Sequence, residues 1–141
     1  MATYNKFESF VGHLAQGVHQ LHAAGHTCNY YLTNNTPSAS ADSVLADLAG
    51  ITEENGYAPA DAQNDASEAS GTLTFTTEDK VWTGTTSDPA FGPFRYVVLY
   101  NDTPTSPEDP LISWWDYGSS ISVNSGETFT ADAGASTFTL T

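Results

Sequence analysis

At 141 residues the chain has the length of one domain, and nothing in it marks a second. Seventeen acidic residues against three basic ones give a formal net charge of -14, which excludes binding to nucleic acid or to an anionic membrane, because both require clustered lysine and arginine. The lone cysteine, Cys28, cannot form an internal disulfide, and we expect it to be a small buried apolar residue.

The N-terminus shows no basic segment followed by an apolar run, and no stretch is apolar enough to span a bilayer. We therefore expect a soluble protein that is made in the cytoplasm. The acidity has two interpretations, solubility in a salty medium or attraction to a basic protein surface.

Residues 6–22 predict an amphipathic α-helix, with Thr3 or Asn5 as its N-cap and Gly25 as its end. Its apolar stripe consists of Phe7, Phe10, Val11, Leu14, Val18 and Leu21. Two internal glycines each weaken such a helix by about 1 kcal/mol relative to alanine, so it needs a surface to pack on. That surface is its own β domain or another protein, and an apolar stripe usually packs on its own domain first.

Four histidines, His13, His19, His22 and His26, lie along this segment at spacings that place pairs of imidazoles on one helix face. No HExxH pattern is present, and no cysteine or carboxylate accompanies the histidines at ligand spacing. We therefore expect polar-face histidines and no metal site.

From Cys28 to residue 34, apolar and polar residues alternate, which predicts a strand. A short helical turn is expected at 44–48 with Asp42 as its cap, and a brief strand at 50–54. Residues 55–70 are small, acidic and poor in apolar side chains, so they predict a surface loop that is too polar to hold a core.

The densest apolar and aromatic part of the chain is residues 91–120, which predict a hairpin of strands at 96–100 and 111–115. Three prolines in the connector exclude a helix there. Further strands are expected in a hairpin at 71–84 and at 121–123, 128–130 and 137–140. About eight short strands behind one N-terminal amphipathic helix predict a mainly β fold, an antiparallel β-sandwich. We expect one domain over 1–141, with a helical segment at 1–26 and the sandwich at 27–141.

Candidate chemistry is sparse. Acid pairs can serve as calcium ligands or as a general acid and base, but adjacent acids without a glycine-containing calcium loop predict solvated loop charge. The pairs are Glu53-Glu54, Glu78-Asp79 and Glu108-Asp109. No nucleophile elbow, phosphate-binding loop or cysteine pair is present, so we predict no enzyme and no cofactor. Arg95, the only arginine, is expected to pair with a nearby carboxylate.

Trp114, Trp115 and Tyr117 suggest a different activity, the stacking of aromatic rings on sugars. Consecutive residues of a strand point to opposite faces of the sheet. One tryptophan should therefore lie in the core, and the other should face outward, covered by a loop, the helix or a partner protein.

Three segments resemble a family of small structural proteins encoded by tailed phages and prophages: KFESFVGHLAQGVHQL, LTNNTPSASADSVLADLAGITEENGY, and GPFRYVVLYNDT followed by DPLISWWDYGSSISVNSGETFT. Members of the family are similar to the jelly-roll cement (decoration) proteins on the outside of icosahedral heads. The resemblance implies a jelly-roll-like virion protein on the outer capsid surface, which binds the major capsid protein as a dimer or larger homo-oligomer. The chain departs from the family pattern in its histidine-rich segment, its acidic stretch at 58–70 and its strong acidity.

The candidate interface residues come from the helix stripe and the aromatic hairpin. They are Phe7, Phe10, Leu14, Val18, Trp114, Trp115 and Tyr117. Two other functions stay open: a tail, baseplate or head-tail component, and a carbohydrate-binding β-sandwich for host attachment.

Overall fold

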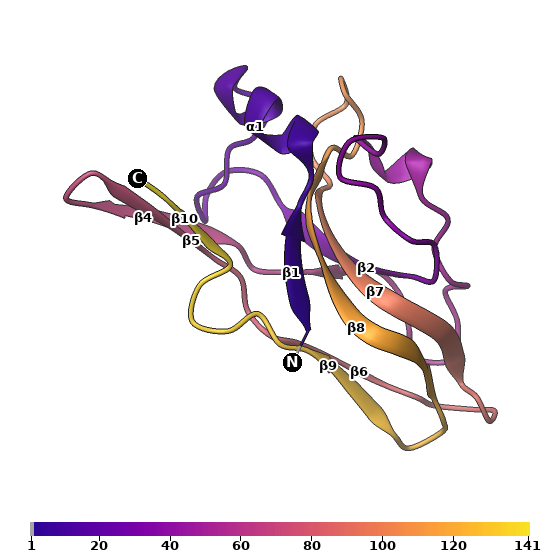
Figure 1. The fold of residues 1–141 in the computed structure, drawn as a ribbon. Coiled ribbons are helices and arrows are strands. Elements are labelled where there is room, and N and C mark those ends of the chain that lie inside the picture. The colour runs from indigo at the N-terminus through magenta and orange to yellow at the C-terminus, as the bar shows by residue number, and fades with distance from the viewer. Residues whose placement is uncertain (1) are drawn as a thin grey trace.

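The computed structural model describes residues 2–141 as a mainly β domain with one α-helix near the N-terminus (Figure 1). This confirms the predicted fold class, with ten strands where about eight were expected. The helices are α1 (Glu8–Ala15) and the 3₁₀ turn η1 (Leu45–Asp47). The strands are β1 (Thr3–Lys6), β2 (Cys28–Thr33), β3 (Ala60–Asp61), β4 (Asp65–Ala69), β5 (Thr72–Thr76), β6 (Lys80–Thr83), β7 (Phe91–Asn101), β8 (Leu111–Val123), β9 (Thr128–Ala131) and β10 (Phe138–Leu140).

One layer of the sandwich is a five-stranded antiparallel sheet in the order β1-β8-β7-β2-β3. Two smaller antiparallel sheets, β10-β5-β4 and β6-β9, lie across one face of it (Figure 1). The central hairpin, β7 with β8, is the one predicted from residues 91–120, and both of its strands are longer than expected.

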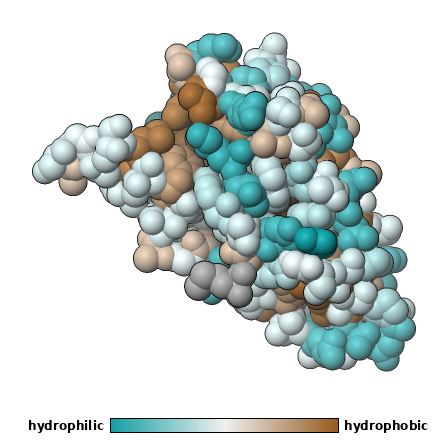
Figure 2. Space-filling view, in the orientation of Figure 1, coloured by the Kyte–Doolittle hydropathy of each residue, from teal (hydrophilic) through white to brown (hydrophobic). Residues whose placement is uncertain are grey.

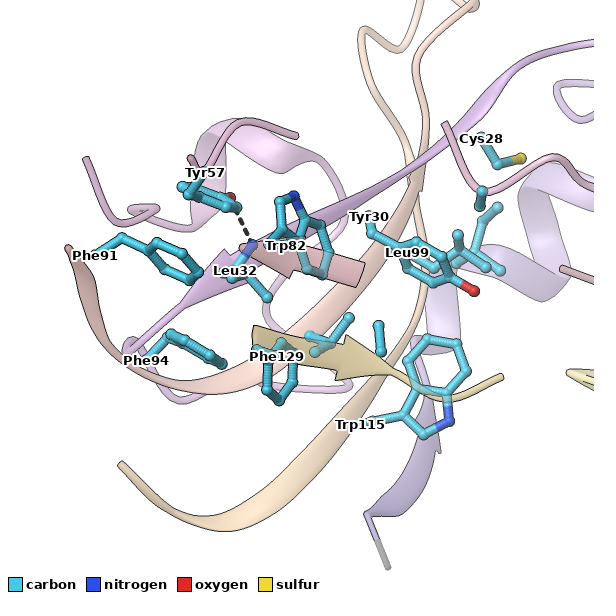
Figure 3. Close-up of a cluster of buried hydrophobic side chains, with 14 of the residues drawn as sticks. Cys28, Tyr30, Leu32, Tyr57, Trp82, Phe91, Phe94, Leu99, Trp115 and Phe129 are labelled. Atoms are coloured by element: carbon cyan, nitrogen blue, oxygen red, sulfur yellow. Dashed lines mark hydrogen bonds between the residues drawn. The ribbon is translucent and has the colours of Figure 1, made fainter. Parts of the chain in front are cut away.

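Aromatic rings from both layers fill the space between the sheets (Figure 3). Trp82 of β6 stacks on Phe129 of β9, and Phe129 meets the ring of Phe94 from β7 edge to face, with 4.7 Å between centroids. Cys28 lies fully buried in the same cluster, as predicted. The layers are therefore joined mainly by burial of large apolar rings, which dominate the energetics of such cores.

The part of the β7–β8 hairpin at residues 96–100 and 111–115 is buried on both faces. Val97 and Leu99 face the main core, whereas Val98 and Tyr100 face a second apolar cluster on the opposite side of the sheet. Phe7 and the segment around η1 cover that second cluster. Strands that are buried on both faces have continuous apolar sequences instead of an alternating pattern, which accounts for the unbroken run at 96–100.

Helix α1 is shorter than the predicted helix at 6–22. Thr3 and Asn5 cap no helix, because they belong to β1 and pair with β8. Gly17 ends the helix in place of Gly25: its φ is 75°, its N–H donates to the Leu14 carbonyl, and the next N–H donates to the carbonyl of residue 13. This is the Schellman arrangement, which turns the chain out of the helical path. Among residues 2–141, no helix is long and apolar enough to cross a membrane.

The prediction of a core-free surface loop at 55–70 is wrong. β3 and β4 form within it, and Tyr57 and Ala62 are buried in the main core. The Tyr57 hydroxyl accepts a hydrogen bond of 2.8 Å from the N–H of Leu32 (Figure 3). The buried Asn64 holds the stretch as well: its side chain accepts a hydrogen bond from the N–H of Cys28 and donates to the carbonyls of Leu21 and His26.

The hairpin predicted at 71–84 has its strands in the right places but the wrong pairing. β5 pairs with β4 and β10, and β6 pairs with β9. Ser70 and Gly71 make the tight turn between β4 and β5, with φ values of 53° and 81°. Two successive positive φ values are typical of the turn that matches the twist of a two-stranded hairpin.

The remaining predicted elements match in part. β2, β9, β10 and η1 lie where they were expected, and residues 121–123 continue β8. Asp47, not Asp42, caps η1 by accepting hydrogen bonds from the N–H groups of Ser43 and Val44. The brief strand expected at 50–54 is reduced to one bridge between Thr33 and Gly50.

Candidate protein-interaction surface

An apolar groove opens where α1, β1 and β10 meet, and we name it the α1/β10 groove. Its cavity of about 290 Å³ is lined by Tyr4, Lys6, Phe10, Val11, Leu14, Phe138, Thr139 and Leu140. Val11 and Leu140 remain 52% and 39% exposed, two of the three large apolar side chains left exposed in residues 2–141. Figure 2 shows hydrophobic residues gathered over α1 and β10, at the upper left of the molecule. Exposed apolar surface of this kind is typical of a contact site.

A second cavity of about 330 Å³ lies on the other side of Tyr4, and we name it the β1 cavity. Its walls include Trp115 and Tyr117 of β8 and the segment that leads from β9 to β10. Tyr4 lines both cavities, so they follow β1 one after the other.

The position of these cavities follows from the sheet topology. β1 is the last strand of the five-stranded sheet, and β10 is the last strand of the three-stranded sheet. Each has a strand neighbour on one side only within residues 2–141. The sandwich therefore has an open side between two strand edges, and α1 covers only one end of it.

The predicted interface residues of the helix stripe belong mostly to the protein's own core. Phe7 and Phe10 are 0% and 1% exposed. Phe7 packs on Trp114 with 4.5 Å between ring centroids, and Phe10 packs edge to face on Phe138 at 5.4 Å. Leu14 is half-buried and lines the α1/β10 groove, so it contributes to the open surface. Val18 is half-buried and lies beyond the end of α1.

Trp114 and Trp115 lie on opposite faces of the sheet, as expected for neighbours in a strand. Trp115 belongs to the main core, while Trp114 belongs to the cluster that Phe7 covers, so the chain itself encloses the outward ring. Trp114 and Trp115 are only 8% and 7% exposed. Tyr117 is half-buried, and its ring packs edge to face on Phe129 at 5.1 Å.

Several groove residues were not predicted. Val11 was part of the stripe but not of the interface set, and Tyr4, Phe138 and Leu140 were not considered for it. The alternating pattern of 137–140 predicted a strand there. No sequence signal says that this strand lies at a sheet edge next to the helix.

Three of the four histidines, His13, His19 and His26, lie together in a cluster, and only His22 is exposed as a polar-face residue would be. The side-chain amide of Asn101 lies 3.0 Å from Nδ1 of both His19 and His26, and the ring of His13 lies 6.1 Å from that of His19. His19 is buried, which contradicts the expected polar position. Burial, together with the nearby His13 and His26, lowers the pKa of His19 from 6.5 to about 4, so the ring is neutral at pH 7. Within residues 2–141, no group of three or more histidine, cysteine or acidic side chains is arranged to hold a metal ion.

Within residues 2–141 the charged side chains form one ion pair, and several of the carboxylates accept hydrogen bonds from backbone N–H groups. The expected ion pair of Arg95 is confirmed: its guanidinium donates to both carboxylate oxygens of Asp116 at 2.7 and 2.9 Å. The hydrogen bonds from Arg95 lower the pKa of Asp116 below its ordinary value. In the three acid pairs every side chain is exposed except the half-buried Asp109, and Asp79 accepts a hydrogen bond of 2.8 Å from the N–H of Ala133, so solvated loop charge describes the pairs only in part.

Comparison of the chain with protein-family models, with curated proteins and with solved structures found no match. The resemblance to phage structural proteins therefore stays a prediction.

Proposed function

We propose that this protein is a phage virion structural protein, a cement protein that binds the outer surface of the head and stabilises contacts between neighbouring major capsid subunits. The α1/β10 groove carries the proposal, because it contains two of the three large apolar side chains that are exposed in residues 2–141. An open apolar groove beside strand edges suits contact with another protein. The sequence resemblance supplies the class of partner.

The charge of the chain supports a protein partner with a basic surface. The formal net charge is -14, and Arg95, one of the three basic residues, is already paired with Asp116. Long-range attraction between opposite charges accelerates association. A shell also offers many copies of the same site, so modest contacts add up to firm attachment when the bound protein is a dimer or larger oligomer.

The two alternatives differ in how well the surface suits them. A tail or baseplate protein would use the same kind of groove, so only its location separates it from a cement protein. A carbohydrate-binding module needs an open aromatic face, and Trp114 and Trp115 are almost completely buried. The geometry therefore favours a protein contact over a sugar contact.

Electron cryomicroscopy of the virion that carries this protein tests the proposal directly. We expect density for a small β-sandwich on the outside of the head, in contact with more than one major capsid subunit. Density on the tail or baseplate would instead support the second function. Absence of the protein from purified virions would overturn both.

A matched pair of variants tests the groove itself. Val11→Asp and Val81→Asp make the same chemical change at valines of nearly equal exposure, 52% and 50%, but only Val11 lines the groove. Val11 would become buried only in the complex with the capsid. Loss of that contact should weaken the binding of Val11→Asp to isolated heads, measured by co-sedimentation, about tenfold or more. Val81→Asp should bind like the wild type, and both should melt normally because neither side chain is buried. Equal binding of the two variants would show that the groove is not the contact site.

A further inference from the structure

β1 is an edge strand: within residues 2–141 it pairs with β8 on one side and with no strand on the other. We propose that it accepts an extended segment of a basic protein, which adds to the five-stranded sheet as a sixth strand. The inference rests on the proposed function for the identity of that protein, a capsid subunit, and on the structure alone for the way in which the segment binds.

The backbone of β1 shows which groups are available. The Phe7 N–H donates to the Ile112 carbonyl at 3.2 Å, and the same register pairs Asn5 with Trp114. Backbone groups of an antiparallel strand alternate in direction, so those of Tyr4 and Lys6 point away from β8. Within residues 2–141 no backbone hydrogen bond joins these groups to another segment, and Lys6 is exposed.

The two cavities explain how side chains of the added strand would be accommodated. The α1/β10 groove and the β1 cavity lie on either side of Tyr4, with volumes of about 290 and 330 Å³. A strand placed beside β1 directs every second side chain to this inner face, at intervals of about 7 Å. Each cavity is large enough for an apolar side chain such as leucine. The edge thus offers backbone hydrogen bonds for affinity and two pockets for selection of sequence, as in other strand-addition sites.

Charge decides which occupant fits. A second copy of the chain would bring a further formal charge of -14 to the same edge, and the two copies would repel each other. The edge itself carries one exposed base, Lys6, but exposed acids lie at both of its ends: Glu8 follows β1 at the start of α1, and Asp132 lines the β1 cavity. The preferred segment therefore has apolar residues at alternate positions and lysine or arginine between them or at its ends.

Nuclear magnetic resonance with two synthetic peptides tests the binding mode. The probes are a short peptide of alternating lysine and valine and its counterpart with glutamate in place of lysine. The basic peptide should shift the amide signals of Tyr4 and Lys6 and slow their hydrogen exchange, because these groups gain partners. The acidic peptide should leave them unchanged. Shifts confined to other regions, equal binding of both peptides, or a dimer formed through β1 in ultracentrifugation would overturn the inference.

Two substitutions of Lys6 separate the contribution of its backbone N–H to binding from the contribution of its side-chain charge. Lys6→Pro removes an N–H that points away from β8, so the existing ladder keeps its hydrogen bonds. Lys6→Thr removes the same charge but retains the N–H. Lys6→Pro should bind the basic peptide and isolated heads at least about tenfold more weakly than Lys6→Thr. Circular dichroism establishes that each variant is folded, and if Lys6→Pro is not, hydrogen exchange of the wild-type Lys6 amide decides alone.

The outcomes separate this inference from the proposed function. If the wild type binds heads and the two Lys6 variants bind equally well, the cement function stands and strand addition fails. If the wild type does not bind heads but the basic peptide protects the β1 amides, the edge is a strand acceptor and the cement function fails.

Discussion

His19 is a buried imidazole that the fold keeps neutral. Its Nδ1 lies 3.0 Å from the amide nitrogen of Asn101, and its ring packs on Phe10 with 5.1 Å between centroids. A positive charge here would lose its hydration and would lie beside His13 and His26, which is why the pKa falls to about 4. The segment after α1 therefore depends on an uncharged His19.

This residue should make the stability depend on pH. The pKa of His19 is about 4 in the folded protein, and the ordinary value of 6.5 applies to the unfolded chain. The unfolded state therefore takes up the proton first as the pH falls, and stability that is complete above pH 6.5 is lost between pH 6.5 and 4. The loss is at most about 1.4 kcal/mol per pH unit and about 3 kcal/mol in total.

Urea unfolding at several pH values between 7.5 and 4.5 measures this effect. The His19→Gln variant should lose most of the dependence, because a neutral amide has no proton to gain. His22→Gln is the matched control, since His22 is exposed, and it should behave like the wild type. The same pH dependence in wild type and His19→Gln would contradict the assignment.

At the scale of elements, the two glycines of α1 should respond in opposite directions to alanine. Gly12 lies inside the helix and Gly17 at its end, and a Cβ would meet no atom within 4 Å at either position. Gly12→Ala should stabilise the protein by about 0.5–1 kcal/mol, because alanine loses less freedom in a helix. Gly17→Ala should destabilise it by about 1 kcal/mol, because its φ of 75° strains any residue with a Cβ. Thermal unfolding measures both changes, and shifts of equal sign would show that the helix does not end at Gly17.

The sequence pattern predicted the helix correctly up to the end of α1, where interactions between nearby residues determine the structure, but not beyond it. The spacing of Phe7, Phe10 and Leu14 is a local signal, and these residues do face the protein. Beyond Gly17 the path of the chain depends on a distant residue: the amide of Asn64 donates to the carbonyls of Leu21 and His26. Periodicity alone contains no information on such contacts, so the helix was predicted too long.

Strands were easier to predict than their partners. The alternation at Leu73 and Phe75 identifies β5, and that around Trp82 identifies β6, because period-two patterns depend on nearby residues alone. The pairing of β6 with β9 instead depends on contacts such as the stack of Trp82 on Phe129. The α1/β10 groove could not be predicted from the sequence for the same reason, because Val11 and Leu140 come together only through the arrangement of the sheets.

At the scale of the whole molecule, a strongly acidic surface coexists with an open apolar edge. Each copy of the chain carries a formal net charge of -14, and this repulsion opposes the pairing of one β1 edge with the β1 edge of a second copy. Under the proposed function, the same charge would attract a basic partner to that edge. Net charge and edge geometry would thus act together in the choice of partner.

This combination predicts opposite responses of folding and binding to salt. Raising NaCl from about 0.01 M to about 0.15 M shortens the Debye length from about 30 Å to about 8 Å, which screens the repulsion among the acids of this chain. The melting temperature should rise by a few degrees, on the order of 1 kcal/mol for a domain of this size. Binding to heads should weaken over the same range, because the attraction to the basic partner is screened as well. Sodium chloride is preferable to sulfate, which strengthens apolar burial by a separate effect. A melting temperature that falls with salt would contradict dominant self-repulsion, and head binding that is unaffected by salt would mean that apolar contacts alone select the partner.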